Sequence, residues 1–452
     1  MKKIVWVITI ALLIAAFCLR FYKYENNSGF DWDQNRDYGE VKQIASGNPV
    51  ILGPVAKGSG GFYLGSLYYY ILVPAYTFMD HSLYALPLTS IVIDSIFVAC
   101  IFLVLYKITG KKVTLIVSVI WATCWLMIGA SRVSWNVALV PIWSLFTLYS
   151  IYKVVTEKSR IHFYLLGLLL GLSIHIHVSI IPIIPIFALL YFRHLRFTLR
   201  DWIFTIILMI VPIIPLIIYD LNHGFLNAHL LRNQLGTQAI ARTSIWQMMY
   251  MSMVKLGKVV SGIFFAKFSD NIFLGIITTI LAIKSAIFDK KLLSKLAGQT
   301  ILISIFLIIV LGDYGFPEYY FAAAYLAIIV LFVMLLSKLP SILMYPIFSL
   351  IIVLNLLDYS IIPTGFSLKY KYDMVATLKD FKEPIDMSYQ FDPGRDGGFR
   401  YIIELFDIKT DPKSRTRILL TDKLNTPLYI DGELARDLSV IGNFKSALYI
   451  VQ

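Results

Sequence analysis

The sequence predicts an all-α polytopic membrane protein with a small external α/β domain at its C-terminal end. Hydrophobic residues make up 58% of the 452 residues and charged residues only 15%, a balance outside the range of soluble globular domains. The apolar residues fall in runs long enough to cross about 30 Å of hydrocarbon. From about Asp358 onward the composition becomes charged and mixed, with strand-like runs at 417–420, 427–430 and 447–451.

Eleven apolar runs qualify as membrane spans by their length and by the charges that flank them. They lie near residues 4–22, 84–106, 113–130, 136–152, 162–177, 178–192, 202–219, 271–288, 297–312, 318–336 and 340–357. Residues 246–268 are too amphipathic for a span, so we interpret them as a surface helix. The alternative is a twelfth span, which would move the C-terminal domain to the other side of the membrane.

Basic residues predict the orientation, because Lys and Arg gather in alternate loops. The clearest clusters lie around Lys111, Arg160, Arg196 and Lys291. The positive-inside rule places these loops and the N-terminus in the cytoplasm. The intervening loops then face outward, including a long first loop at 23–83 and a second at 220–270. We therefore expect a membrane domain over 1–357 and, after an odd number of spans, an external domain over 358–452.

The net charge of +12 does not indicate a nucleic-acid partner. A protein that binds nucleic acid clusters its basic residues on one face, whereas here they are spread between apolar runs. The three cysteines, Cys18, Cys100 and Cys124, lie within apolar runs at spacings that fit neither a disulfide framework nor a metal site. We expect contacts with membrane lipids and no redox chemistry.

The first external loop holds the densest group of polar residues in the chain. If residues 33–46 form a helix, four polar side chains share one of its faces, namely Asp33, Arg36, Asp37 and Glu40. Glycines and a Tyr-Tyr-Tyr segment follow between Gly53 and Tyr70. Glycines let the backbone approach a ligand, and aromatic faces cover the C–H surface of a sugar. Together these features are typical of a sugar-phosphate pocket.

A purely structural interpretation of the same residues stays open. Asp31 or Asp33 could cap the helix, and Arg36 could pair with its neighbours. Taken alone, the helix favours this interpretation at least as strongly as the functional one.

The order of these features resembles the C-superfamily (GT-C) of membrane glycosyltransferases. The closest branch is glycosyltransferase family 39, together with the dolichyl-phosphate-mannose protein mannosyltransferases and the lipid A aminoarabinose transferases. One span precedes an external Asp, a polar helix, a Gly-Pro turn and an aromatic segment. Supporting motifs further along the chain are Arg132-x-x-Trp135-Asn136, the segment from Gly171 to His177, and Asp220-x-x-His223-Gly-Phe225.

The resemblance implies that Asp33 is the general base in an inverting transfer of a sugar. The donor would be a polyprenyl-phosphate sugar, and the acceptor a hydroxyl of a lipid, wall polymer or protein on the outer face. Relatives usually follow the aspartate with Glu, where this chain has Gln34. This difference puts a second adjacent carboxylate in doubt. It also leaves a divalent metal ion as an open question, and no other cofactor is expected.

Outward-facing polar residues are candidates for binding the donor, because the departing phosphate needs cations and hydrogen-bond donors. Besides the residues of the polar helix, they are Lys57, Tyr69, Arg132, His177, Arg232, Arg242 and Glu318. Each of these could instead be structural. The pair Tyr319 and Tyr320 is typical of an interfacial belt.

A secondary transporter or a lipid-linked sugar flippase is the alternative function. Its coupling site would be Asp94, which lies inside the second span, where an ionised carboxylate costs roughly 2.5–3.5 kcal/mol on insertion scales. We expect this carboxylate to be paired. Neither the long polar first loop nor the external domain is required for transport.

Overall fold

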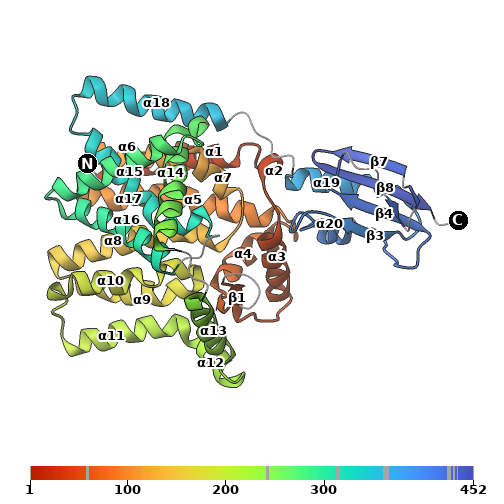
Figure 1. Cartoon of the computed structure of the whole chain (residues 1–452), viewed down its shortest axis with the longest axis horizontal. Coiled ribbons are helices and arrows are strands. Elements are labelled where there is room, and N and C mark those ends of the chain that lie inside the picture. Colours follow the sequence, from red (N-terminus) through yellow and green to blue (C-terminus); the bar gives the residue numbers. More distant parts are fainter. Residues whose placement is uncertain are drawn as a thin grey trace.

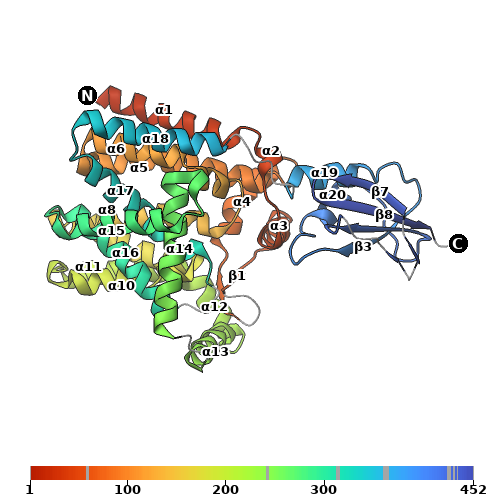
Figure 2. The ribbon, with the colours of Figure 1, turned by 45° about the horizontal axis from the view of Figure 1, so that its top comes forward.

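The computed structural model describes residues 2–56, 61–240, 244–311, 316–359, 366–424, 429–430, 433–434 and 436–450. Within these residues the chain forms a bundle of helices with a small sheet domain at one end (Figure 1). Both views place α2 (Tyr24–Asn27), the short helix that follows the first span, between the bundle and the sheet domain (Figure 1, Figure 2). The predicted fold class is confirmed.

The bundle is built mainly from fourteen helices among the described residues. In chain order they are α1 (Lys2–Phe21), α5 (Ala85–Thr109), α6 (Lys111–Thr123), α7 (Trp125–Ser131), α8 (Val140–Glu157), α9 (Arg160–Ile176), α10 (Ile183–Leu190), α11 (Leu199–Ile210), α12 (Ile214–Asn222), α14 (Ile245–Phe265), α15 (Ile272–Phe288), α16 (Leu292–Leu311), α17 (Ala322–Leu336) and α18 (Ser341–Tyr359). Short 3-10 turns join several of them, including η1 (Asn136–Leu139), η2 (Val178–Ile180) and η6 (Glu318–Phe321).

Each of the eleven predicted spans coincides with an apolar helix or helix pair, so the chain is a multi-pass membrane protein. Within the described part of the chain, seven helices are long and apolar enough to cross a membrane by themselves. The bent pair α6–α7 makes eight if it is counted as one span. Four predicted spans fall on shorter apolar helices, namely α9, η2 with α10, α15 and α18.

The prediction that residues 246–268 form a surface helix is wrong. Much of α14 is buried in the core of the bundle, including Leu256, Val260, Ile263 and Phe264. A Cβ on Gly275 of α15 would lie 1.7 Å from the carbonyl oxygen of Gly257, so the two helices pack backbone against backbone. Lys255 donates to the carbonyl oxygen of Phe316. At least this lysine of α14 therefore contacts another segment of the protein rather than the membrane surface.

The helix α14 is itself long and apolar enough for a span. Both views draw its axis steeply inclined to those of α1 and α11 (Figure 1, Figure 2). The helix α1 begins at one end of the long axis, and the C-terminal domain lies at the other (Figure 1).

Asp94 of α5 is a paired residue, as expected. Its Oδ2 lies 2.5 Å from Nε of Arg20, and its Oδ1 accepts a hydrogen bond from the indole of Trp121 at 3.1 Å. Arg20 also donates to the carbonyl oxygens of Trp121 and Ala122, where α6 and α7 meet at a bend of 58°. Backbone carbonyls freed by a broken helix inside a bilayer need such donors. The position of Asp94 inside a span, which suggested a transporter, is thus explained by its ion pair with Arg20.

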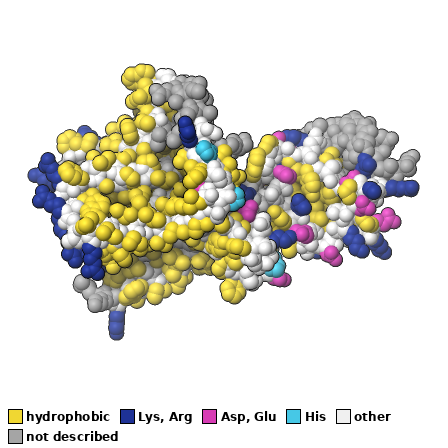
Figure 3. Space-filling view, turned by 90° about the horizontal axis from the view of Figure 1, so that it is seen from below, with side chains coloured by type: hydrophobic (Ala, Val, Ile, Leu, Met, Phe, Trp, Pro, Cys, Tyr) yellow, Lys and Arg dark blue, Asp and Glu magenta, His cyan; other side chains and the backbone are white. Residues whose placement is uncertain are grey.

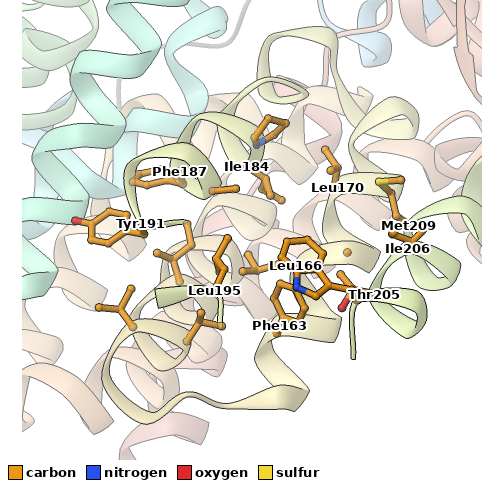
Figure 4. Close-up of a pocket in the computed structure, with 17 residues that line it drawn as sticks. Phe163, Leu166, Leu170, Ile184, Phe187, Tyr191, Leu195, Thr205, Ile206 and Met209 are labelled. Atoms are coloured by element: carbon orange, nitrogen blue, oxygen red, sulfur yellow. The ribbon is translucent and has the colours of Figure 1, made fainter. Parts of the chain in front are cut away.

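A small apolar cavity lies between α8, α9, α10 and α11 (Figure 4). Its volume is about 150 Å³, and its lining side chains include Phe163, Leu166, Phe187 and Trp202. The neighbouring helices α9 and α11 approach closely because Gly167 leaves room: a Cβ there would lie 2.3 Å from the carbonyl oxygen of Thr205. Small residues permit the same close packing in many membrane helix pairs.

The remaining segments surround the end of the bundle at which α1 finishes. They comprise α2 (Tyr24–Asn27), α3 (Trp32–Ala45), β1 (Leu52–Val55), β2 (Tyr63–Gly65), α4 (Leu67–Phe78) and α13 (Leu226–Ile240). The C-terminal domain contains α19 (Leu368–Ala376), β3 (Asp386–Gln390), α20 (Phe399–Leu405), β4 (Thr416–Thr421), β5 (Tyr429–Ile430), β6 (Glu433–Leu434), β7 (Arg436–Ile441) and β8 (Phe444–Ile450). Its main sheet has the order β3-β4-β8-β7, with β3 and β4 parallel and the other pairs antiparallel. The predicted α/β domain is thus present.

The first external loop and the C-terminal domain share one hydrophobic core. The loop contributes side chains such as Phe30, Tyr38, Val41 and Tyr69. The domain contributes others such as Leu368, Phe399, Ile402 and Phe444. The change of composition near Asp358 therefore marks a boundary along the sequence but not a boundary between two cores. Removing the C-terminal domain would expose the buried side of α3.

Candidate functional site

The helix α3 begins at a cap that also connects it to the bundle. The side chain of Gln34 accepts a hydrogen bond from the backbone N–H of Asp31 at 2.9 Å. Its amide nitrogen donates to the carbonyl oxygen of Ser134 at 2.6 Å. The position at which relatives would carry a second carboxylate is thus a structural cap in this chain. Asp33 follows in the first turn of the helix.

One guanidinium joins the two carboxylates of α3. Arg36 Nη1 donates to Asp33 Oδ1 at 2.8 Å, and its Nε and Nη2 donate to Asp37 Oδ1 at 2.9 and 2.6 Å. The side chain of Asp33 is 50% exposed, whereas that of Asp37 is fully buried. The predicted common face of the helix is confirmed for these three residues. The two carboxylates differ sharply in their access to solvent.

The buried carboxylate of Asp37 has an unusual environment. Burial raises the pKa of Asp37 to about 7, against the opposing effect of the Arg36 guanidinium. Within the described residues, its second oxygen, Oδ2, is buried without a hydrogen-bond partner. Burial also raises the pKa of Glu40, one turn further along the helix. Shifted carboxylates that gather on one face are typical of functional sites, although ion-pair networks produce them too.

Aromatic side chains from three other segments enclose the polar face of α3. Tyr69 of α4 is buried and lies within hydrogen-bonding reach of Arg36. Tyr319 of η6 lies close enough to Asp33 to be influenced by its charge. The rings of Trp135 and Tyr319 have their centroids 4.8 Å apart in an edge-to-face arrangement. Aromatic walls around a carboxylate suit a sugar ligand.

His177, a substrate-binding candidate from the sequence, lies in this aromatic group. Its ring centroid lies 5.7 Å from that of Tyr319 and 5.0 Å from that of Tyr320. The His177 Nδ1 accepts the backbone N–H of Ser179 at 3.2 Å, so a neutral ring carries its proton on Nε2. Tyr319 and Tyr320, which the sequence suggested for an interfacial belt, have their rings beside that of His177. Their position directly after Glu318, at the start of a span, is the sequence signal that could have placed them in this group.

The structure places the other predicted residues in several different segments. Arg132 is buried and donates to the carbonyl oxygens of Leu19, Arg20 and Tyr22, which caps the end of α1. Glu318 is half-buried at the start of η6. Arg232 is exposed on α13. Lys57 and Arg242 lie outside the described residues.

A buried lysine connects the C-terminal domain to the start of α3. The Lys371 ammonium donates to the carbonyl oxygens of Phe30, Arg395 and Gly397 at 2.7, 2.8 and 2.6 Å. Burial lowers the pKa of Lys371 to about 8, so the group remains largely protonated at neutral pH. The backbone N–H of Gly398 donates to the side chain of Asn35 at 3.0 Å. The glycine-rich turn of the domain thus lies directly on α3.

A cleft of about 550 Å³ opens between the C-terminal domain and the bundle, beside the start of α3. Four aromatic residues line it, namely Trp125, Trp135, Tyr359 and Phe366. Three charged residues, Asp31, Arg132 and Arg395, also line it. The Arg395 guanidinium lies 3.6 Å from Asp31 and 4.0 Å from the ring of Phe366. The cleft is wide enough for a polar ligand with sugar-like faces.

The described residues do not supply a set of ligands for the divalent metal ion that the sequence left open. Within them, no three His, Cys, Asp or Glu side chains come together to hold a metal. Between Asp33 and Asp37 the bridging position is occupied by the Arg36 guanidinium. We therefore assign no chemical step to a metal ion.

Comparisons with known proteins support the fold. No family model and no curated protein sequence matches the chain. The crystal structure of ArnT from Cupriavidus metallidurans bound to undecaprenyl phosphate is similar over 98% of both chains, with 9% identity and a TM-score of 0.64. The apo structure of the same protein is similar over 100% of this chain and 99% of that chain, with 10% identity and a TM-score of 0.63. The chain thus has the GT-C membrane glycosyltransferase fold, as the resemblance implied.

We predict that Lys371→Met lowers the free energy of unfolding by about 3 kcal/mol or more, because three buried carbonyls would lose a charged donor. Chemical denaturation in detergent measures this loss. Lys369→Met is the matched control, since Lys369 is 43% exposed and its ion pair in the described part of the chain is with Asp373 on the same helix. It should cost less than about 1 kcal/mol. Equal losses for the two variants would contradict a specific role for Lys371.

Proposed function

We propose that this protein transfers a sugar from a polyprenyl-phosphate donor to an acceptor hydroxyl, at the end of the bundle that carries the C-terminal domain. The observation that supports this most is the half-exposed Asp33, which Arg36 holds on the face of α3 that Tyr69 and Tyr319 border. The fold adds support, because ArnT, which has a similar fold, has been crystallised with undecaprenyl phosphate. Glycosyl transfer is the chemistry that best uses a carboxylate, a guanidinium and aromatic walls together.

In this proposal Asp33 is the general base. A lipid phosphate leaves readily, so the reaction needs a base for the acceptor hydroxyl more than an acid for the departing oxygen. The acceptor oxygen forms a bond to the anomeric carbon while the bond from that carbon to the phosphate oxygen breaks. The hydroxyl proton passes to the Asp33 carboxylate, and the electron pair leaves with the phosphate. Attack from the side opposite the phosphate inverts the anomeric configuration.

Arg36 is the proposed partner of the departing phosphate. Its bonds to Asp33 and Asp37 use three of the five N–H donors of a guanidinium. Tyr69 approaches the same group and offers a phenolic hydroxyl. Donors held in place before the reaction stabilise the charge that develops on a leaving phosphate.

The first test is the Asp33→Asn variant. We expect turnover to fall by about 10²–10⁴-fold, because the amide keeps the shape of the side chain but cannot accept the proton. Donor affinity should stay within about threefold of the parent, since the lost interaction acts on the transition state. Purified protein with a polyprenyl-phosphate sugar gives both quantities.

Two further variants make this test specific. Asp80→Asn, an exposed carboxylate of the same external loop, should leave turnover unchanged. Asp37→Asn should be milder than Asp33→Asn, because the Asp37 side chain is buried and does not reach the solvent-exposed side of the helix. A general base contributes far more than about threefold to turnover. If Asp33→Asn therefore kept its turnover within about threefold of the parent, Asp33 would not be the general base.

The C-terminal domain is proposed to orient the acceptor, which is a lipid, a wall polymer or a protein. The domain side of the cleft carries Phe366 and Arg395, next to the start of α3. We expect Phe366→Ala to raise the acceptor KM by about tenfold, the upper end of an aromatic contact, with turnover nearly unchanged. Tyr389→Ala removes an exposed aromatic ring of the same domain and is the control. An unchanged KM in Phe366→Ala would remove the support for this role.

The proposed orientation puts the N-terminus in the cytoplasm and the C-terminal domain outside. Figure 3 shows Lys and Arg side chains gathered at the end of the bundle away from that domain. Reporter tags after Lys112, Arg160 and Lys291 should therefore report the cytoplasm. A tag after Gln452 should report the exterior, and a cytoplasmic signal there would reverse the proposal.

A further inference from the structure

A second cleft lies at the end of the bundle opposite the candidate site. The helix α5 leaves the first external loop at Ala85 and ends at Thr109, so its far end lies roughly 37 Å away at the usual rise per residue. There the links α5–α6, α15–α16 and α17–α18 surround a cleft of about 530 Å³. We call it the inner cleft. The proposed glycosyl transfer does not use it.

Three lysines from these three separate links line the inner cleft. They are Lys112 at the start of α6, Lys291 before α16, and Lys338 after α17. All three are exposed, so their ammonium groups can move toward a ligand. The Lys112 ammonium lies 5.4 Å from the ring centroid of Tyr345, over its face. Cations that approach one point from different segments indicate an anion site.

The one carboxylate among the lining residues is largely used within the protein. Asp289 accepts hydrogen bonds from the Ser294 hydroxyl and from the backbone N–H of Lys291, both at 3.0 Å. Its contact with the Lys338 ammonium is long, at 3.9 Å. The side chain of Asp289 is only 10% exposed. The positive charge of the lysines therefore exceeds the negative charge that faces the cleft.

The wall of the inner cleft is apolar. Val113 and Leu292, which are half-buried, and Leu293 and Met334, which are buried, line it together with the lysines. Beyond this end, hydrophobic side chains cover most of the visible surface of the bundle (Figure 3). A site with cations at the membrane surface and an apolar wall beneath fits a phosphate group that carries acyl chains. A soluble phosphate would use only the cations.

We propose that the inner cleft binds the headgroup of an acidic phospholipid from the membrane leaflet at this end. The lipid phosphate contacts Lys112, Lys291 and Lys338, and its acyl chains lie along the apolar wall. A lipid bound there connects three inter-helix links that are far apart in the sequence. Because the folded protein alone presents this site, the lipid stabilises the folded state.

The experiment titrates purified full-length protein in detergent with phosphatidylglycerol, with phosphatidylcholine and with inorganic phosphate. Binding is read from native mass spectra, and stability from the thermal unfolding midpoint. We expect phosphatidylglycerol to bind at least tenfold more tightly than phosphatidylcholine and to raise the midpoint. The triple variant Lys112→Gln, Lys291→Gln, Lys338→Gln should lose about a hundredfold in affinity, at about fivefold for each lysine near a membrane surface.

The matched control is Lys111→Gln, Lys290→Gln, Lys295→Gln, which removes three exposed lysines at the same end of the bundle, near the start of α6 and around the start of α16, outside the cleft lining. The affinity of this control for phosphatidylglycerol should stay within about threefold of the parent, a much smaller loss than the one of about a hundredfold expected for the cleft variant. Equal losses in both triple variants would show only a diffuse positive surface and overturn the proposal. Equal binding of both lipids would overturn it too, and so would binding of inorganic phosphate as tight as that of lipid. If the triple variant does not fold, Lys338→Gln alone should lose about fivefold.

Discussion

Inside a bilayer, a backbone carbonyl that no N–H group reaches needs another donor, and two arginines supply those donors here. Arg20 reaches the carbonyls of Trp121 and Ala122 where α6 bends into α7. Arg132, just after α7, reaches the carbonyls at the end of α1, including that of Arg20 itself. The end of the first span and the broken third span are thus fixed to each other. The external segments are built on this junction.

The junction determines where α3 lies, and α3 carries the candidate site. The segment after Arg132 presents the Ser134 carbonyl that receives the Gln34 amide. On its other side, the start of α3 receives the buried ammonium of Lys371 through the carbonyl of Phe30. A helix held from the bundle and from the C-terminal domain can keep its carboxylates in one position. Such positioning matters more for catalysis than the identity of any one supporting residue.

The sequence predicted the parts of this structure that have a local signal. Span length and flanking charge located the apolar helices, and the spacing of Asp33, Arg36 and Asp37 placed them on one face of α3. The roles of Arg132 and Lys371 could not be predicted in this way, because their partners lie far away in the chain. The burial of α14 was missed because Gly257 and Gly275 allow a close backbone contact that its amphipathic pattern does not show. Local pattern thus indicates which residues share a face, and long-range packing decides which of them act together.

In the proposed glycosyl transfer, the charge balance on α3 lets a carboxylate-rich face accept an anionic phosphate. Asp33, Asp37 and Glu40 would together exceed the single positive charge of Arg36 and repel the donor if all were ionised. Burial raises the pKa of Asp37 to about 7, so near neutral pH this side chain carries only part of its charge. Partial protonation of Asp37 lessens the repulsion while Asp33, half-exposed, remains open to the solvent side. The same burial that holds Arg36 and Asp37 next to Tyr69 of α4 therefore makes the face less negative.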